Sequence, residues 1–246
     1  MIKILSAMLL LVLPVKWSYW LLNIMGHRIH KKARCGFSLI VCDRIQLGAD
    51  AAIGNMNLVK IERIVLDEKS KIGKFNVLNG PYSLHLASTA IIGKFNKMSR
   101  GKSGTSYRDA ELKMGTGAII VSNHYLDLTK SVTFGDYSIL AGISSQIWTH
   151  GYMHAPEGPE RFRVDGAVNI GNNVYIGSGS IINPGVYIAA SINVGGGSCV
   201  AKSLLQPGMY VSQPLRYIPK KYEDTKAKLK QITAEGLIEE VYEKQA

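Results

Sequence analysis

Two histidines and a tryptophan lie close together in the stretch SQIWTHGYMH, residues 145–154, where a regular apolar pattern ends and a segment rich in proline and charge begins. A neutral imidazole accepts a proton readily, because its reference pKa of about 6.5 lies close to neutrality. His150 is therefore a candidate general base. His154 is a second candidate, with the alternative that the loop presents it to solvent.

A second polar group lies upstream in the stretch NHYLD, residues 123–127. Asp127 could accept the N–H of an imidazole and so fix its tautomer, which is the usual role of a carboxylate beside a working histidine. The alternatives are that Asp127 caps a turn and that His124 is a surface histidine.

A six-residue repeat indicates the element that must position these groups. From residue 170 the chain reads IGNNVY, IGSGSI, INPGVY, IAASIN, VGGGSC and VAKSLL. The first position of each hexad is aliphatic: Ile170, Ile176, Ile182, Ile188, Val194 and Val200. A period of six fits neither an amphipathic helix nor an alternating strand. It predicts a triangular solenoid in which three hexads complete a coil of about 18 residues. Weaker copies upstream extend the solenoid over about residues 40 to 205.

Composition agrees with short strands and tight corners, since 46% of the residues are hydrophobic and 25 are glycines. The net charge of +11 predicts an anionic partner, for which nucleic acid, an anionic membrane surface and a phosphate-rich cofactor all qualify. Cys35, Cys42 and Cys199 lack metal-ligand spacing and are interpreted as buried thiols of a reducing compartment.

The N-terminus is strongly apolar. Residues 4–25 approach the length of about 20 apolar residues that crosses a bilayer, but Pro14 and Lys16 divide them. Trp17 and Trp20 suit a membrane interface, and the basic run HRIHKKAR at residues 27–34 would attract anionic headgroups. Residues 1–34 are thus predicted to contact a membrane from its surface. The alternatives are a cleaved secretory signal, and residues buried either in an oligomer contact or as a cap on the rest of the fold.

The hexads, together with INPGV at 182–186, VAKS at 200–203 and SQPLRYI at 212–218, resemble the left-handed β-helix acyltransferases typified by maltose and galactoside acetyltransferases. The stretch at 123–154 is most similar to bacterial O-acetyltransferases that modify polysaccharide or lipopolysaccharide sugars. The resemblance implies an all-β, left-handed parallel β-helix that uses acetyl-CoA as donor, a sugar acceptor, a homotrimer, and neither metal nor nucleic acid. It also implies a place on the cytoplasmic side of the bacterial inner membrane.

The resemblance implies a role for each site residue. His150 matches the catalytic histidine of the family, although Gly151 replaces the usual proline after it. His124 and Asp127 would assist in catalysis. Asn123, Trp148 and His154 would contact the acceptor, with packing at the end of a coil as the alternative for Trp148.

The same family binds CoA along a groove between neighbouring solenoids. The residues that this implies as cofactor-binding are Tyr175, Ser178, Gly196, Ala201, Lys202 and Arg216. Lys202 and Arg216 would meet the phosphates, Lys202 as a point charge and Arg216 as a fork. Either could instead be a solvated surface charge.

The predicted organisation has three parts: a membrane-associating segment 1–35, a β-helix domain 36–218 with an insertion at about 151–167, and a helical tail 219–246. Two other activities stay open. One is a γ-class carbonic anhydrase-like zinc enzyme using His124, His150 and His154. The spacing of His150 and His154 is shorter than in that family, which argues against this activity. The other is N-acetylation of an amino sugar.

Overall fold

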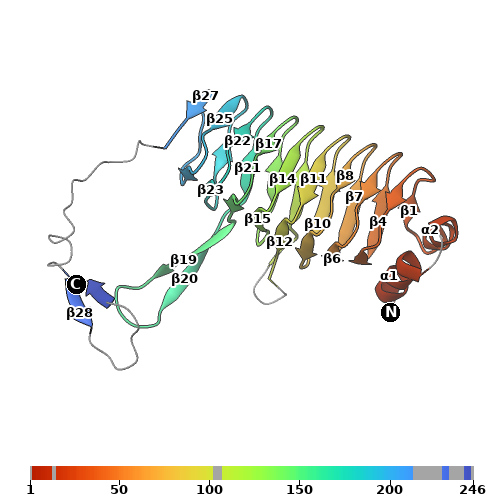
Figure 1. The fold of residues 1–246 in the computed structure, drawn as a ribbon, viewed down its shortest axis with the longest axis horizontal. Helices are drawn as coiled ribbons and strands as arrows, with labels where there is room; N and C mark the ends of the chain where they lie inside the picture. The colour runs from red at the N-terminus through yellow and green to blue at the C-terminus, as the bar shows by residue number, and fades with distance from the viewer. Residues whose placement is uncertain (1, 13–14, 102–106, 213–228, 233–240, 245–246) are drawn as a thin grey trace. The chain divides into compact units, whose positions relative to one another are not determined.

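The computed structural model describes residues 2–12, 15–101, 107–212, 229–232 and 241–244. The chain divides into two compact units, Met1–Ser212 and Gln213–Ala246. The larger unit is a parallel β-solenoid whose coils stack one after another (Figure 1). This confirms the predicted all-β solenoid, whose handedness stays a prediction. The predicted boundary at residue 218 lies outside the described residues and stays a prediction.

Successive coils place their short strands in three parallel sheets. In the described part of the chain, the first sheet holds β1 (Arg28–Ile29), β4 (Arg44–Leu47), β7 (Arg63–Leu66), β10 (Ser83–Leu86), β13 (Glu111–Met114), β16 (Val132–Phe134), β21 (Val168–Ile170) and β24 (Tyr187–Ile188). The second holds β2 (Arg34–Cys35), β5 (Ala52–Ile53), β8 (Lys71–Ile72), β11 (Ile91–Lys94), β14 (Ile119–Ser122), β17 (Ile139–Leu140), β22 (Tyr175–Ile176), β25 (Ile192–Val194) and β27 (Gly208–Tyr210). The third holds β3 (Leu39–Val41), β6 (Leu58–Lys60), β9 (Val77–Asn79), β12 (Lys97–Ser99), β15 (Tyr125–Asp127), β18 (Gln146–Ile147), β23 (Ile181–Ile182) and β26 (Cys199–Val200).

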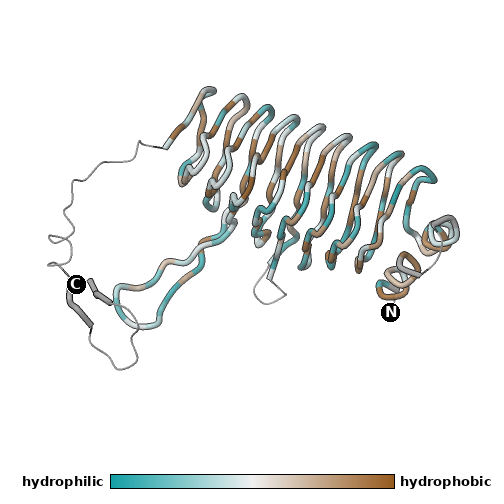
Figure 2. Tube along the Cα trace, in the orientation of Figure 1, coloured by the Kyte–Doolittle hydropathy of each residue, from teal (hydrophilic) through white to brown (hydrophobic). Residues whose placement is uncertain are grey.

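The hexad pattern explains why the strands form. The six predicted inward positions, Ile170, Ile176, Ile182, Ile188, Val194 and Val200, are all buried. Their strand neighbours such as Asn169 and Tyr175 face solvent, so apolar and polar residues alternate along each coil (Figure 2). Stacking the coils joins these aliphatic side chains into one continuous core.

A ladder of buried polar side chains runs along the corner between the second and third sheets. Its members are Ser38, Asn57, Asn76, Asn96, His124, Ser145, Ser180 and Ser198. The backbone N–H of Asn76 donates to Oδ1 of Asn57 at 2.9 Å, and that of Asn96 donates to Oδ1 of Asn76 at 2.9 Å. The ladder therefore satisfies backbone donors that the turn would otherwise leave unpaired inside the fold.

Two helices, α1 (Ile2–Val12) and α2 (Val15–Ile24), pack on the first coil of the solenoid. Leu22 belongs to the hydrophobic core, and the hydroxyl of Tyr19 donates to the carbonyl of Ala33 at 3.3 Å. The helices thus cap the open end of the core, as the alternative of a buried cap predicted. Within the predicted segment 1–35, β1 begins the solenoid at Arg28. Within the described residues no helix has the length and apolar character needed to cross a membrane.

The unit Gln213–Ala246 contains β28 (Leu229–Ile232) paired in antiparallel fashion with β29 (Val241–Lys244). The predicted helix is therefore wrong at these two segments, where cross-strand backbone hydrogen bonds replace those of a helix. The rest of the predicted helical tail lies outside the described residues.

Among the cysteines, Cys42 is buried as predicted, Cys35 is half-buried and Cys199 is exposed.

Candidate active site

The break in the solenoid brings Asp127 and His150 together. Asp127 ends β15, which pairs with β18 on the next coil. His150 follows β18 and begins β19 (His150–His154), which leaves the coil. The Nδ1 atom of His150 lies 2.8 Å from Oδ2 of Asp127. The structure therefore brings together two residues that the sequence analysis named separately, and their catalytic roles stay a prediction.

Two threonines hold the carboxylate of Asp127 inside the fold. Thr149 donates its backbone N–H and its hydroxyl to Oδ2 at 3.0 and 2.6 Å, and the Thr129 hydroxyl donates to Oδ1 at 2.9 Å. Burial alone would raise the pKa of Asp127, but the hydrogen bonds from Thr149, His150 and Thr129 together lower that pKa below its usual value. Asp127 is therefore an ionised acceptor at neutral pH.

The hydrogen bonds also assign the tautomer of His150. Thr129 Oγ1 lies 3.1 Å from Nδ1, and its one proton is donated to Asp127. Nδ1 thus faces two acceptors and must carry the ring proton of the neutral imidazole. The lone pair then lies on Nε2, which has no hydrogen-bond partner among the described residues, and 27% of the side chain is exposed. His150 is arranged to accept a proton at Nε2.

Aromatic side chains surround the imidazole. The rings of Trp148 and Tyr152 meet it edge-on, with centroid distances of 6.1 and 6.0 Å. Trp148 also packs on Tyr125 with a centroid distance of 5.0 Å, and its indole N–H donates to Gln146 at 2.9 Å. Trp148 therefore packs against its neighbours and is also half-exposed beside His150. Packing at the end of a coil and contact with an acceptor, the two roles considered for Trp148, are compatible.

The insertion predicted at about 151–167 is an antiparallel hairpin of β19 and β20 (Arg161–Asp165). His150 lies opposite Asp165 and Tyr152 opposite Arg163, and Arg163 forms an ion pair with Asp165 through Nε at 2.7 Å. Alternation along the strands places these side chains on one face. The other face exposes Met153, Phe162 and Val164.

His154 lies on the same face as His150, further along β19, where it is exposed and pairs with Arg161. This position fits a contact to an acceptor or to solvent, the two alternatives that the sequence left open.

His124 does not join the catalytic pair. Its Nδ1 accepts the backbone N–H of Ser145 at 3.1 Å, and the side chain is a rung of the buried polar ladder. Burial lowers the pKa of His124 to about 4, so the ring is neutral at pH 7. The predicted catalytic role of His124 is therefore replaced by a structural one. Asn123, the residue before His124 at the same corner, is exposed with a left-handed backbone (φ 55°).

The predicted cofactor-binding residues lie on the C-terminal coils. Ala201 and Lys202 line a pocket of about 380 Å³ with Cys199 and Tyr210. Tyr175 is exposed on β22. The Ser178 hydroxyl donates to the carbonyl of Ile143 at 2.7 Å, which uses its only proton within the corner.

Glycine lets neighbouring coils approach closely at that corner. A side chain at Gly196 would come within 3.1 Å of the Ser178 carbonyl. Arg216 lies outside the described residues.

No three side chains of the types that ligate metals gather closely enough to hold an ion within the described ranges of the chain. The trio His124, His150 and His154 is not assembled, since His124 lies in the ladder and His154 is displaced along the hairpin.

Sequence reasoning missed Thr129 and Thr149. Thr149 directly precedes His150, and Thr129 lies two residues after Asp127. Aligning the coils by hexad would have placed the end of β15 beside the residues just after β18, which include Thr149, because the two strands pair in parallel with Leu126 beside Ile147. That both hydroxyls turn toward the buried carboxylate depends on side-chain orientation, which the repeat does not specify.

No protein-family profile matches the sequence. No curated protein matches it either. The fold does resemble solved structures of acyltransferases. The polysialic acid O-acetyltransferase OatWY matches at a TM-score of 0.45 and 17% identity over 80% of this chain and 88% of that one. The polySia-specific acetyltransferase NeuO matches at 0.42 and 16% identity over 78% of each chain. The UDP-N-acetylglucosamine O-acyltransferase LpxA from Moraxella catarrhalis RH4 matches at 0.40 and 18% identity over 76% and 70%.

Proposed function

We propose that the chain is an acetyl-CoA-dependent O-acetyltransferase that acts on a sugar hydroxyl of a cell-surface polysaccharide or of its lipid-linked or nucleotide-linked precursor. The observation that carries the proposal is the His150–Asp127 pair, with Nδ1 fixed on a buried carboxylate and Nε2 unpartnered among the described residues at the solvent side. The donor and acceptor classes rest on the sequence resemblance of the hexads and of residues 123–154.

The proposed chemistry needs one base. Nε2 of His150 takes the proton of the acceptor hydroxyl as its oxygen attacks the thioester carbonyl carbon. The imidazolium that forms is stabilised by the ionised Asp127, 2.8 Å from Nδ1. The C–S bond breaks, and the departing thiolate takes the proton back from Nε2. The atoms balance without an enzyme-bound acyl group or a metal.

The acceptor would lie against Trp148 and Tyr152, whose rings flank the imidazole. The CoA portion would extend over the C-terminal coils, with Lys202 at its phosphates. Support for this direction comes from the pocket at Lys202 and the exposed Tyr175.

We also propose a homotrimer on the cytoplasmic side of the bacterial inner membrane. The exposed apolar face of the β19–β20 hairpin supports an assembly that covers it, because an isolated two-stranded hairpin is marginally stable in water. Trp17 and Trp20 are exposed on α2 and support interfacial contact.

A panel of nucleotide- and lipid-linked sugars, incubated with acetyl-CoA and purified protein, tests the proposal through release of free thiol and the mass of the product. An O-acetylated sugar whose formation depends on His150 supports it. Formation of an N-acetylated amino sugar would instead identify the acceptor as an amine. If none of the acceptors causes release of free thiol, the proposal is contradicted.

A further inference from the structure

Three bulky side chains occupy left-handed backbone positions at the corner that carries the polar ladder. Met56, Phe75 and Phe95 have φ angles of 60°, 59° and 59°. They belong to successive coils, since Phe75 N–H donates to the carbonyl of Asn55 and Phe95 N–H to that of Lys74. The left-handed conformation is unfavourable for residues other than glycine, and asparagine is among the residues that tolerate it best. The next coil indeed carries Asn123 there.

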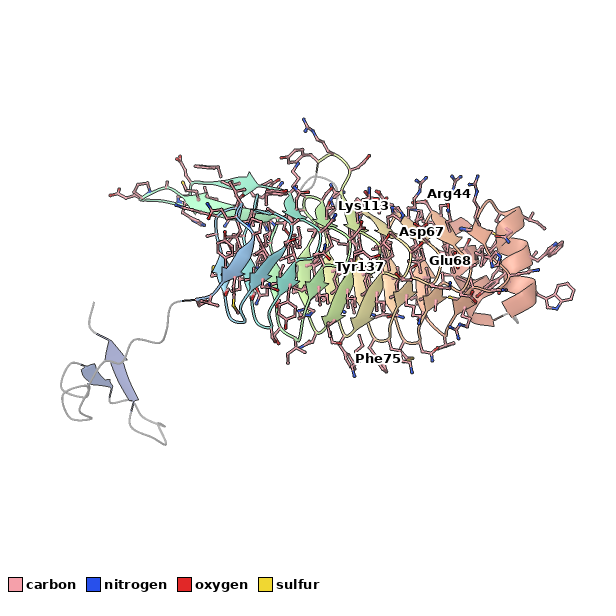
Figure 3. The ribbon with its side chains drawn as sticks, turned by 90° about the horizontal axis from the view of Figure 1, so that it is seen from above. Arg44, Asp67, Glu68, Phe75, Lys113 and Tyr137 are labelled. Carbon is pink, nitrogen blue, oxygen red and sulfur yellow. The ribbon has the colours of Figure 1, made fainter. Side chains whose placement is uncertain are left out.

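These strained side chains are also exposed. Relative exposure is 54% for Met56, 44% for Phe75 and 51% for Phe95, and the two phenyl rings stack 5.0 Å apart with an interplanar angle of 6°. Core packing therefore does not account for them. Phe75 projects from one side of the solenoid, opposite the side that carries Arg44 and Lys113 (Figure 3).

A second exposed apolar row lies beside the first. Leu39, Leu58 and Val77 are in register on β3, β6 and β9 and all face solvent. We call the two rows together the apolar ridge: Phe37, Leu39, Met56, Leu58, Phe75, Val77 and Phe95. A hollow of about 620 Å³ beside Phe95, lined by Ile91 and Ile119, extends the apolar surface onto the second sheet.

Lysines border the ridge without acidic residues among them. Lys74, Lys94 and Lys97 are exposed, and segments 36–42, 54–60, 73–79 and 93–100 contain no Asp or Glu. A two-fold contact with a second copy, which would pair this face with itself, would bring lysine against lysine. The charge pattern instead fits an anionic surface.

The ridge begins next to the N-terminal cap. Helix α1 packs beside β3, the strand that carries Leu39. The cap itself exposes apolar side chains: Ile4, Leu5, Met8, Trp17, Trp20 and Ile24. Apolar exposure therefore continues from the cap onto the first four coils.

We infer that the apolar ridge binds the surface of an anionic membrane, with its apolar side chains at the boundary between headgroups and acyl chains and its lysines at the headgroup phosphates. Bulky apolar groups rimmed by lysine match that interface in both chemistry and charge. The inference extends the membrane contact proposed for the N-terminal residues but does not depend on acetyl transfer.

The test is the double variant Phe75→Asn, Phe95→Asn in the full chain. Asparagine relieves left-handed strain, so thermal stability should be unchanged or higher. Binding to vesicles of phosphatidylcholine with phosphatidylglycerol, followed by sedimentation, should weaken about tenfold or more, because two apolar side chains no longer insert. Lys74→Gln, Lys94→Gln should weaken binding several-fold and reduce its salt dependence.

The matched control is Tyr137→Asn. Tyr137 is an exposed aromatic residue with a φ of 58°, at a different corner from Phe75 (Figure 3). This variant should bind vesicles as the wild type does. Equal vesicle binding by wild type and the phenylalanine double variant would overturn the inference. So would a double variant that binds normally but sediments in lipid-free buffer as a smaller oligomer, because the ridge would then be a subunit contact.

The variant Trp17→Ser, Trp20→Ser tests the N-terminal proposal separately. If it abolishes vesicle binding while the ridge variant does not, the ridge inference fails and the N-terminal contact stands. Acetylation of a soluble sugar by the ridge variant should match the wild type. Failure of the acetyltransferase proposal would appear instead as no activity in any variant, with vesicle binding unaffected.

Discussion

At the residue scale, the candidate site depends on one carboxylate held by hydrogen bonds. Asp127 is buried, yet Thr149, His150 and Thr129 donate enough hydrogen bonds to keep it ionised. An ionised Asp127 fixes the proton of His150 on Nδ1, which leaves Nε2 to work as a base. The two histidines of the opening stretch are therefore not equivalent, since His154 has no carboxylate partner among the described residues.

Replacing His150 by alanine tests the base. We expect His150→Ala to lower kcat about 100-fold or more, the usual range for a general base, with little change in the affinity for acetyl-CoA. Steady-state thiol release and a CoA-binding titration measure the two quantities. His154→Ala is the control and should lose much less activity. Wild-type turnover in His150→Ala would remove His150 from the mechanism.

The variant Asp127→Asn tests the tautomer. An amide at this position can donate to Nδ1, which favours the ring proton on Nε2 and removes the base, so kcat should again fall by about 100-fold or more. In that orientation the amide oxygen takes the Oδ1 position and still accepts the hydrogen bond from the Thr129 hydroxyl, whereas the backbone N–H of Thr149 loses its acceptor, so some stability is lost while the fold is retained. Unchanged kcat would show that Asp127 has no role in orienting His150.

Asp127 also predicts a pH dependence of stability. Its pKa is lowered in the folded state, so the stability it contributes is present above the unfolded pKa of about 3.9 and is lost as pH falls through the folded value. Acid unfolding of Asp127→Asn should therefore depend less on pH below about 4 than that of the wild type. Parallel acid titrations followed by circular dichroism measure the difference.

At the element scale, the six-residue repeat of the sequence predicted which residues face the core of the C-terminal coils. The sequence failed where contacts between distant residues determine the structure. The hexads gave the inward positions of the C-terminal coils, because neither a helix nor an alternating strand repeats a buried aliphatic residue every six positions. The first coil was missed, since the basic run at residues 27–34 conceals buried Ile29 and Ala33. His124 was misassigned because a ladder histidine and a catalytic histidine look alike in sequence.

The C-terminal tail is a second place where the local sequence did not predict the structure. Residues 229–232 and 241–244 carry charged, helix-compatible sequence, yet they pair as strands through backbone contacts that no local pattern encodes.

Close stacking of coils gives the element-scale prediction. A side chain at Gly93 would meet the Val121 carbonyl at 1.8 Å, whereas one at Gly151 would meet nothing within 4 Å. Gly93→Ala should therefore lower the free energy of unfolding by about 2 kcal/mol or more through overpacking, and Gly151→Ala should change it by less than about 0.5 kcal/mol. Thermal and denaturant unfolding measure both. Equal stabilities would mean that adjacent coils have more room than their spacing indicates.

At the scale of the whole molecule, the N-terminal helices combine two surfaces that the sequence presented as alternatives. Their inner side belongs to the fold: Leu22 lies in the core, and Ser6 bonds to His27 at 3.0 Å. Their outer side is apolar and exposed. Deleting residues 1–25 would therefore open the solenoid core as well as remove any membrane contact, and the two effects must be separated by single substitutions.

Leu22 and Trp20 make that separation, since they lie on the same helix with opposite exposure, 0% and 58%. Leu22→Ala should lower the free energy of unfolding by about 2–5 kcal/mol, because it leaves a cavity between the cap and the first coil. Trp20→Ser should leave stability within about 0.5 kcal/mol of wild type but weaken binding to anionic vesicles, because an interfacial tryptophan is lost. Denaturant unfolding measures the stability of each variant, and vesicle sedimentation measures its binding to anionic vesicles. If Trp20→Ser destabilises the fold as much as Leu22→Ala and binds vesicles normally, the outer face of the cap is covered by protein and not by lipid.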